Sequence, residues 1–230
     1  MNIQELKDLQ PLVYQQFVTI LEQGRLAHAY LFSGDFASFE MALFLSQALF
    51  CQEKVGVHPC GKCRSCRLIE SNDFSDVTIV APQGNFIKTD TIRELVKNFS
   101  QSGFESSQQV FIIRDAEKMH VNAANSLLKV IEEPQSTIHI FLLTNQEEAV
   151  LPTIKSRTQI ISFPQNLPYL ERFLEEEGLL KTQASLIARL VSSQEEAKRL
   201  ATNKSFIDLL DQAKKFTELL LTDSNRAYLQ

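Results

Sequence analysis

Four cysteines in one short window are the residues whose spacing most directly suggests chemistry. They follow the pattern Cys51-x8-Cys60-x2-Cys63-x2-Cys66, and the chain has no other cysteine. In a reducing cytosol such clustering indicates metal binding rather than disulfides. Four thiolates can complete the closed tetrahedral shell of a structural zinc ion. An iron–sulfur cluster is the alternative, because C-x2-C-x2-C also occurs in ferredoxins, although the ferredoxin run continues C-x3-C-P and this one does not.

Other side chains in the same window could contribute to this site. His58 could replace one cysteine as a ligand. Lys62, Arg64 and Arg67 could contact DNA. We interpret the three cations as solvated charges, because the net negative charge of a thiolate cluster is sufficient reason for them.

The stretch that begins at Gly34 lies where a phosphate-binding loop is expected, between an apolar run and a helical pattern. Such a loop reads G-x-x-x-x-G-K-[ST]: backbone N–H groups surround the phosphates, the lysine meets the outer ones and the hydroxyl binds Mg²⁺. Here Phe39, Glu40 and Met41 stand at the last three of these positions. A lysine about 4 Å from a phosphate contributes about 4 kcal/mol of electrostatic attraction at an effective dielectric of 20. Glutamate turns this attraction into repulsion, so we expect no useful ATP binding. On these residues alone, a glycine that merely ends a strand is the simpler interpretation.

A second pair of acids is also incomplete. A Walker-B strand ends in adjacent acids, one for Mg²⁺ and one to activate water. Here the apolar run 110–113 is followed by Arg114, Asp115, Ala116 and Glu117. If the motif is aligned with its first acid at position 114, Arg114 replaces that acid. If it is aligned one residue later, Ala116 replaces the second acid, so one carboxylate is missing in both alignments. Asp115 could instead be an ordinary turn residue at a strand end.

Three segments resemble the subunits of AAA+ clamp loaders. Residues 125–134, NSLLKVIEEP, resemble their NALLKTLEEP segment. Residues 151–158, LPTIKSRT, resemble the LxTIRSRC stretch that carries a Ser-Arg-Cys motif, and residues 28–34, HAYLFSG, resemble the opening strand. The similarity covers residues 5–165 well and the helical part to about 205 weakly. The segment 125–134 makes the resemblance specific to this family, since Ser-Arg-Thr alone would indicate nothing.

The resemblance implies a non-hydrolysing member of a ring that loads the sliding clamp onto primed DNA during replication. In such rings the Ser-Arg motif lies at a subunit interface, so Arg157, beside Ser156, would be an arginine finger given in trans to a neighbour's ATP. A solvated surface arginine is the alternative. Thr158 departs from the family's cysteine, and Thr144-Asn145 stands at the γ-phosphate-sensing position, where we expect a structural role.

The implied partners are the ATPase subunits of gamma/tau type, the delta subunit, and the clamp and primed DNA through the assembled complex. Neither a membrane nor ATP as a cofactor of this chain is expected. Two other functions stay open: an active AAA+ ATPase of the gamma/tau type, and a zinc-dependent nucleic-acid-binding module. A net charge of −5 argues against a chain that grips nucleic acid strongly by itself.

These residues require an α/β framework to position them. Short apolar runs alternate with helical patterns, which predicts a parallel sheet covered on both faces. The expected strands are 28–33, 77–80, 110–113, 138–143 and 160–163, and the expected helices between them are 9–23, 38–50, 89–99 and 122–133, the last ended by Pro134. Beyond residue 164 only helices are expected, at 167–177, 181–191, 193–202 and 205–221.

The resemblance then implies the domain organisation. We expect an AAA+ P-loop-type parallel-sheet domain over residues 1–164, with the zinc-module insertion at about 51–66. A small helical lid domain follows over 165–204, and 205–230 would be the first helix of a truncated helical collar. The polar start of the chain resembles no signal peptide, and no apolar run could span a bilayer, so a cytoplasmic location is expected.

Overall fold

The computed structural model describes residues 3–99, 108–133, 137–191 and 193–222. The chain divides into two compact units, Met1–Pro164 and Gln165–Gln230. Within the described residues, no helix combines the length and the apolar character that crossing a membrane requires.

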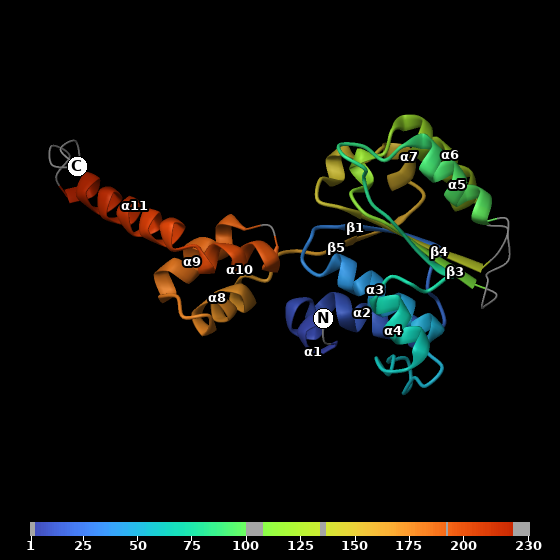
Figure 1. Cartoon of the computed structure of the whole chain (residues 1–230), viewed down its shortest axis with the longest axis horizontal. Helices are drawn as coiled ribbons and strands as arrows, with labels where there is room; N and C mark the ends of the chain where they lie inside the picture. The colour runs from blue at the N-terminus through green and yellow to red at the C-terminus, as the bar shows by residue number, and fades with distance from the viewer. Residues whose placement is uncertain (1–2, 100–107, 134–136, 192, 223–230) are drawn as a thin grey trace. The chain divides into compact units, whose positions relative to one another are not determined.

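A five-stranded parallel sheet forms the centre of the first unit, with strand order β2-β3-β4-β1-β5 (Figure 1). Its inner strands are almost wholly apolar and buried, as a sheet covered on both faces requires. The α/β fold expected from the alternating pattern is therefore confirmed. The strands are β1 Ala29–Ser33, β2 Val77–Val80, β3 Gln108–Ile113, β4 Thr137–Thr144 and β5 Gln159–Ser162.

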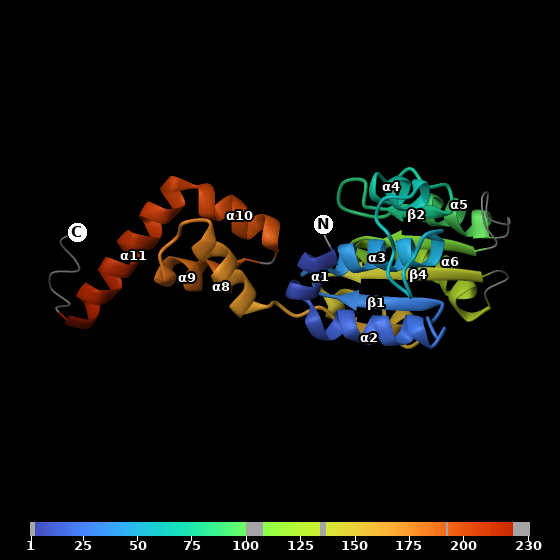
Figure 2. The same cartoon turned by 90° about the horizontal axis from the view of Figure 1, so that it is seen from below.

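Helices cover both faces of this sheet. The first four lie on one face and the next three on the other, as Figures 1 and 2 show together. Short 3-10 turns follow β3 and β4, at Ala116–Lys118 and Glu147–Ala149. The helices are α1 Ile3–Leu9, α2 Pro11–Glu22, α3 Ser38–Phe50, α4 Arg64–Glu70, α5 Thr89–Phe99, α6 Val121–Glu132 and α7 Pro152–Lys155.

The period-two alternation of the strands sorts the core into two layers. Toward α2 the layer is aromatic: the Phe17 ring centre lies 5.4 Å from that of Tyr30 and 5.6 Å from that of Phe32. Toward α5 and α6 the layer is mainly aliphatic, and it includes Leu31 and Ile140. Neighbouring residues of one strand thus pack in opposite layers, which fixes the register of the sheet.

The turn that leaves β1 is held by unusually close backbone packing. Gly34 has φ +113°, and its N–H donates to the carbonyl of Thr144 over 2.8 Å. A Cβ at Gly34 would lie 2.3 Å from the carbonyl oxygen of Phe163. The buried side chain of Gln10 donates to the carbonyls of Phe36 and Pro164 over 2.9 and 2.7 Å. The loop after β1 is therefore fixed against the segment that leaves β5.

Three helices of the first unit were not expected from the sequence: α1, α4 and the short α7. The helix expected at 9–23 corresponds to α2, which begins at Pro11 because proline favours the first helical position. The helix α4 was not expected, since its sequence overlaps the cysteine window; it buries Cys66 and Ile69. The helix α6 ends at Glu132, and Pro134, the expected terminator, lies outside the described residues.

The second unit is entirely helical in its described part. It contains α8 Leu167–Glu176, α9 Lys181–Leu190, α10 Gln194–Thr202 and α11 Lys204–Thr222. Asn166 and Ser193 cap α8 and α10 by accepting hydrogen bonds from backbone N–H groups three residues later. Apolar residues of α8 and α9, among them Leu170 and Ile187, form the buried centre. The assignment of these helices to a lid and a collar stays a prediction.

The substitution Gly34→Ala should lower the free energy of unfolding of the first unit by about 2–4 kcal/mol. The new methyl group meets a backbone oxygen that cannot move aside, and the positive φ adds strain. Gly24→Ala is the matched control: it also has a positive φ, but open space around it, and should lose only about 1 kcal/mol. Chemical denaturation measures both, and equal losses would contradict the packing argument.

Candidate functional site

The segment at the phosphate-loop position connects β1 to α3, and its side chains are largely turned into the protein. Phe36 and Ala37 are buried, and Ala37 has the left-handed φ of +64° just before α3. Met41, at the position of the magnesium-binding hydroxyl, is fully buried. The sequence placed these residues correctly between strand and helix, but it gave no sign that the loop is packed with apolar groups.

An arginine–aromatic stack fills the space beside this loop. The guanidinium carbon of Arg114 lies 4.9 Å from the ring centre of Phe39, within the range of a cation–π interaction. The cavity that remains measures about 30 Å³. This volume admits about one or two water molecules, whereas small-molecule sites commonly enclose about 300–1,000 Å³. Its lining comes from the ends of β1, β3 and β4 and the start of α3: Asp35, Ser38, Phe39, Arg114, Asp115, Leu143, Thr144 and Asn145.

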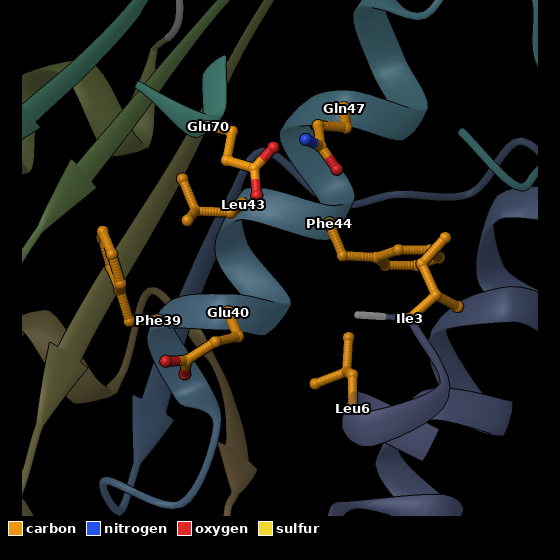
Figure 3. A pocket seen from close by; sticks show the side chains of 8 residues that line it. All are labelled: Ile3, Leu6, Phe39, Glu40, Leu43, Phe44, Gln47 and Glu70. Atoms are coloured by element: carbon orange, nitrogen blue, oxygen red, sulfur yellow. The ribbon is translucent and has the colours of Figure 1, made fainter. Parts of the chain in front are cut away.

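Glu40, at the position of the phosphate-binding lysine, lines a different pocket. This pocket of about 230 Å³ lies between α1 and α3 and combines apolar side chains with Gln47 and Glu70 (Figure 3). Burial raises the pKa of the Glu40 carboxyl above its usual range, and the charge of Asp35 adds to this shift. A half-buried acid in this place contributes no positive charge to the loop.

The acids that follow β3 are engaged by neighbours in the same chain. Asp115 has φ +51° and forms an ion pair with Lys118 at 3.4 Å. Glu117 accepts a 2.6 Å hydrogen bond from the hydroxyl of Thr144, and that hydroxyl accepts the backbone N–H of Gln146. Thr144, which belongs to the pair expected at the γ-phosphate-sensing position, therefore takes part in an internal hydrogen-bond network. Sequence reasoning missed the contact between Glu117 and Thr144. It could have been found, because Glu117 follows β3, Thr144 ends β4, and the carboxyl ends of these adjacent parallel strands lie at the same edge of the sheet.

The four cysteines converge on one point at the end of α3. Their sulfur atoms all lie within 4.8 Å of one another, and those of Cys51 and Cys63 are 3.9 Å apart. The backbone N–H groups of Cys60 and Cys63 donate to the sulfurs of Cys51 and Cys60 over 3.3 Å each. Four sulfurs this close, with backbone donors directed at two of them, could together hold one metal ion.

The local environment affects the thiols differently. Burial raises the pKa of Cys51 and of Cys66. Burial also acts to raise the pKa of Cys63, but hydrogen bonds from Cys66 and from the backbone of Gln52 outweigh it and lower this pKa to about 6. The lowered pKa of Cys63 favours its thiolate, which is the form that binds metals.

Contacts beyond the sulfurs attach this window to the sheet domain. The side chain of Gln47 on α3 donates to the carbonyl of Cys66 over 3.0 Å, and Lys54 donates to the carbonyl of Ala48 over 3.3 Å. The ring of His58 lies 6.2 Å from that of Tyr14, and this histidine does not belong to the sulfur cluster. Three basic side chains of the window are exposed: Lys62, Arg64 and Arg67.

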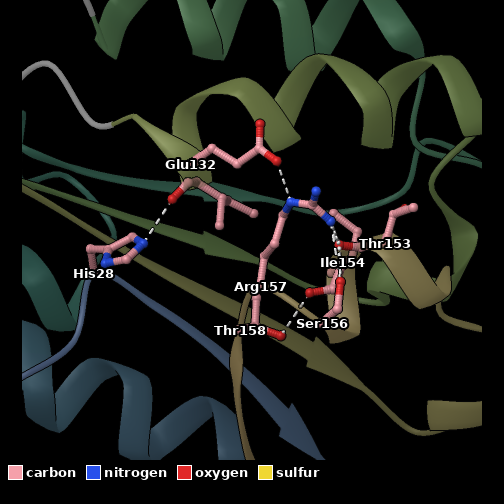
Figure 4. A network of polar contacts seen from close by, with 8 residues as sticks. His28, Glu132, Thr153, Ile154, Ser156, Arg157 and Thr158 are labelled. Carbon is pink, nitrogen blue, oxygen red and sulfur yellow. Dashed lines mark hydrogen bonds and ion pairs between the residues drawn. The ribbon is translucent and has the colours of Figure 1, made fainter.

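Arg157 lies just after α7 and is 38% exposed. Its Nε donates to the carboxylate of Glu132, and its Nη1 donates to the carbonyl of Thr153 and the hydroxyl of Ser156 over 3.2 Å each (Figure 4). Sequence reasoning singled out Arg157 and Ser156 but not Glu132, which lies 25 positions earlier in the chain and becomes its neighbour only through folding. The arginine is therefore on the surface but held in a defined orientation.

The five-stranded parallel sheet, with its strand–loop–helix at Gly34 and acids after β3, defines an α/β protein of the AAA+ class. A solved DNA polymerase III gamma-subunit-related protein of Thermotoga maritima is similar in fold, with a TM-score of 0.50 and 23% identity; the match covers 86% of this chain and 76% of that one.

Sequence comparison narrows the class to a family. The family model described as DNA polymerase III, delta subunit, matches residues 9–166. The DNA polymerase III subunit delta' of Bacillus subtilis is 37% identical over 97% of this chain and 69% of its own length. The gamma/tau subunit of Mycobacterium tuberculosis is 33% identical, over 71% of this chain but only 30% of its own length. The chain belongs to the family of DNA polymerase III delta-prime subunits.

Proposed function

We propose that this chain is a non-hydrolysing subunit of a clamp loader, which acts in the ring that loads the sliding clamp onto primed DNA. The observation that carries the proposal is the filled phosphate site: the Phe39–Arg114 stack leaves a cavity of about 30 Å³ where a triphosphate would need to lie. The half-buried Glu40 supports the same interpretation, because it brings an acid to the position of the lysine. An active ATPase of the gamma/tau type would require both features to rearrange.

The proposed contribution of the chain to catalysis is Arg157, given in trans to the ATP of a neighbouring subunit. Its guanidinium would stabilise the charge that develops on the γ-phosphoryl oxygens, a role worth about 10³–10⁵ in rate where it has been isolated. Exposure of Arg157 and its place beside Ser156 in a Ser-Arg motif support this role.

We further propose that the four cysteines hold one structural zinc ion. Zinc–thiolate bonds of about 2.3 Å in a tetrahedron place the sulfurs about 3.8 Å apart, close to the 3.9 Å between Cys51 and Cys63. Four thiolates leave no open coordination position, so the ion would stabilise the insertion at about 51–66 rather than act in catalysis. The exposed cations of this window are the feature that favours a nucleic-acid-binding module as second candidate, against a net charge of −5.

The domain assignment follows the same family pattern. Residues 1–164 would form the AAA+ domain, 165–204 the lid and 205–230 the first part of the collar that joins subunits. The partners would be the gamma/tau and delta subunits, and through the complex the clamp and primed DNA, all in the cytoplasm.

Calorimetric titration with ATP or ADP and Mg²⁺ should show no binding at millimolar nucleotide. The double substitution Glu40→Lys with Met41→Thr should not create binding, because the stack of Phe39 and Arg114 still fills the site. A gamma/tau subunit titrated in parallel serves as the positive control. A micromolar dissociation constant for the parent chain would refute the non-hydrolysing assignment.

Elemental analysis of protein purified without chelator should return one zinc ion per chain. Cys63→Ser should lose the metal and destabilise the insertion locally, while the sheet stays folded, because metal binding contributes directly to local folding free energy. Ser71→Ala, an exposed change just beyond α4, should retain zinc and serves as the control. Recovery of iron would favour the iron–sulfur alternative instead.

Arg157→Ala should lower the DNA-stimulated ATPase of the reconstituted loader partly, since the arginine serves one of several ATP sites, and clamp loading further. Folding and zinc content should not change, because an exposed side chain contributes little to stability. Arg157→Lys should rescue poorly, because lysine lacks the planar fork of donors. Arg25→Ala, another exposed arginine, is the matched control. Normal ATPase and loading with Arg157→Ala would disprove the arginine-finger role.

A further inference from the structure

The guanidinium of Arg157 is held on one side and open on the other. Glu132 accepts from Nε, and the Thr153 carbonyl and Ser156 hydroxyl both accept from Nη1. Among the described residues no acceptor is bonded to Nη2, and no dashed line reaches this nitrogen from the residues drawn in Figure 4. Three bonds to two nitrogens fix the plane of the group and leave one edge available as a donor.

Glu132 stands in a place where a helix by itself disfavours an acid. It is the last residue of α6, and the next residue, Glu133, is also acidic. Carbonyl groups at the carboxyl end of a helix carry partial negative charge, so acids there are unfavourable. The contact with Arg157 offsets the repulsion between Glu132 and the helix end. Among the described residues, no contact offsets it for Glu133.

We propose that Glu132 is a positioning residue for the arginine finger. Together with the Thr153 carbonyl and the Ser156 hydroxyl, it holds the guanidinium so that Nη2 faces outward, toward a γ-phosphoryl group on a neighbouring subunit. This inference rests on the proposed role of Arg157 in trans, and it assigns to that role a second side chain from a different element of the fold.

The physical reason is preorganisation. A free arginine side chain has several rotatable bonds and loses considerable rotamer entropy each time it is ordered. Donors that are already oriented toward developing charge need no such ordering when the reaction occurs. The pair is solvent-accessible, with 38% of the Arg157 side chain and 47% of the Glu132 side chain exposed, so it contributes little to the stability of the fold. Its main effect is therefore on orientation.

The test uses the loader reconstituted from the full-length protein with its gamma/tau and delta subunits, clamp and primed DNA. Single-turnover ATP hydrolysis gives the rate, and a separate titration gives ATP affinity. Glu132→Ala should slow hydrolysis about fivefold at the ATP site that Arg157 serves, without changing ATP affinity. A change of about fivefold is what the loss of an exposed ion pair corresponds to. Glu132→Gln keeps an oxygen acceptor for Nε and should stay within about twofold of the parent. Glu133→Ala removes the same charge one residue away and should have no effect.

A double variant, Glu132→Ala with Arg157→Ala, should be no slower than Arg157→Ala alone, because Glu132 acts only through the arginine. Equal losses for Glu132→Ala and Glu133→Ala would overturn the proposal in favour of a general charge effect. Faster hydrolysis with Glu132→Ala would overturn it by showing that the pair restrains the arginine. A normal rate with Glu132→Ala beside a slow Arg157→Ala would refute the positioning role alone, whereas a normal Arg157→Ala would refute the arginine finger itself.

Discussion

The parallel direction of the five strands is the constraint on which the rest of this structure depends. All five carboxyl ends lie at one edge of the sheet, so residues that follow different strands are brought together there. Gly34 follows β1, Arg114 follows β3 and Thr144 ends β4, although they are far apart in sequence. The close contact of Gly34 with the Phe163 carbonyl then fixes how the loop after β1 lies at this edge. In an AAA+ protein this is the edge where a nucleotide would be placed.

Two arginines of this domain illustrate opposite uses of the same side chain. Arg114 is exposed, but its guanidinium stacks on Phe39 beside the phosphate-loop position. Arg157 lies on the surface, held by Glu132 and by the turn of α7, with one nitrogen open. These two arrangements support our proposal that the subunit binds no nucleotide itself and presents Arg157 to a neighbouring subunit.

The cysteine cluster belongs to the same domain but does not lie at the carboxyl ends of the strands. Cys51 ends α3 and Cys66 belongs to α4, so a bound ion would connect two helices across the intervening loop. Hydrogen bonds such as that from Gln47 to the carbonyl of Cys66 already support this geometry. Because the four sulfurs come together only in the folded chain, the binding free energy of a metal there would add to the stability of the insertion.

The parallel α/β sheet and the positions of its strands could be predicted from the sequence, because apolar runs and helical patterns are local. The family could also be predicted, because the segment 125–134 is specific. The sequence also located the four cysteines and the incomplete phosphate loop. Three helices were missed: α1, α7, and α4, whose residues were interpreted only as part of a metal knuckle. The stacking of Arg114 on Phe39 and the contact of Glu132 with Arg157 became evident only in the folded chain. These contacts join residues tens of positions apart, and their geometry depends on side-chain packing, which no local pattern in the sequence encodes.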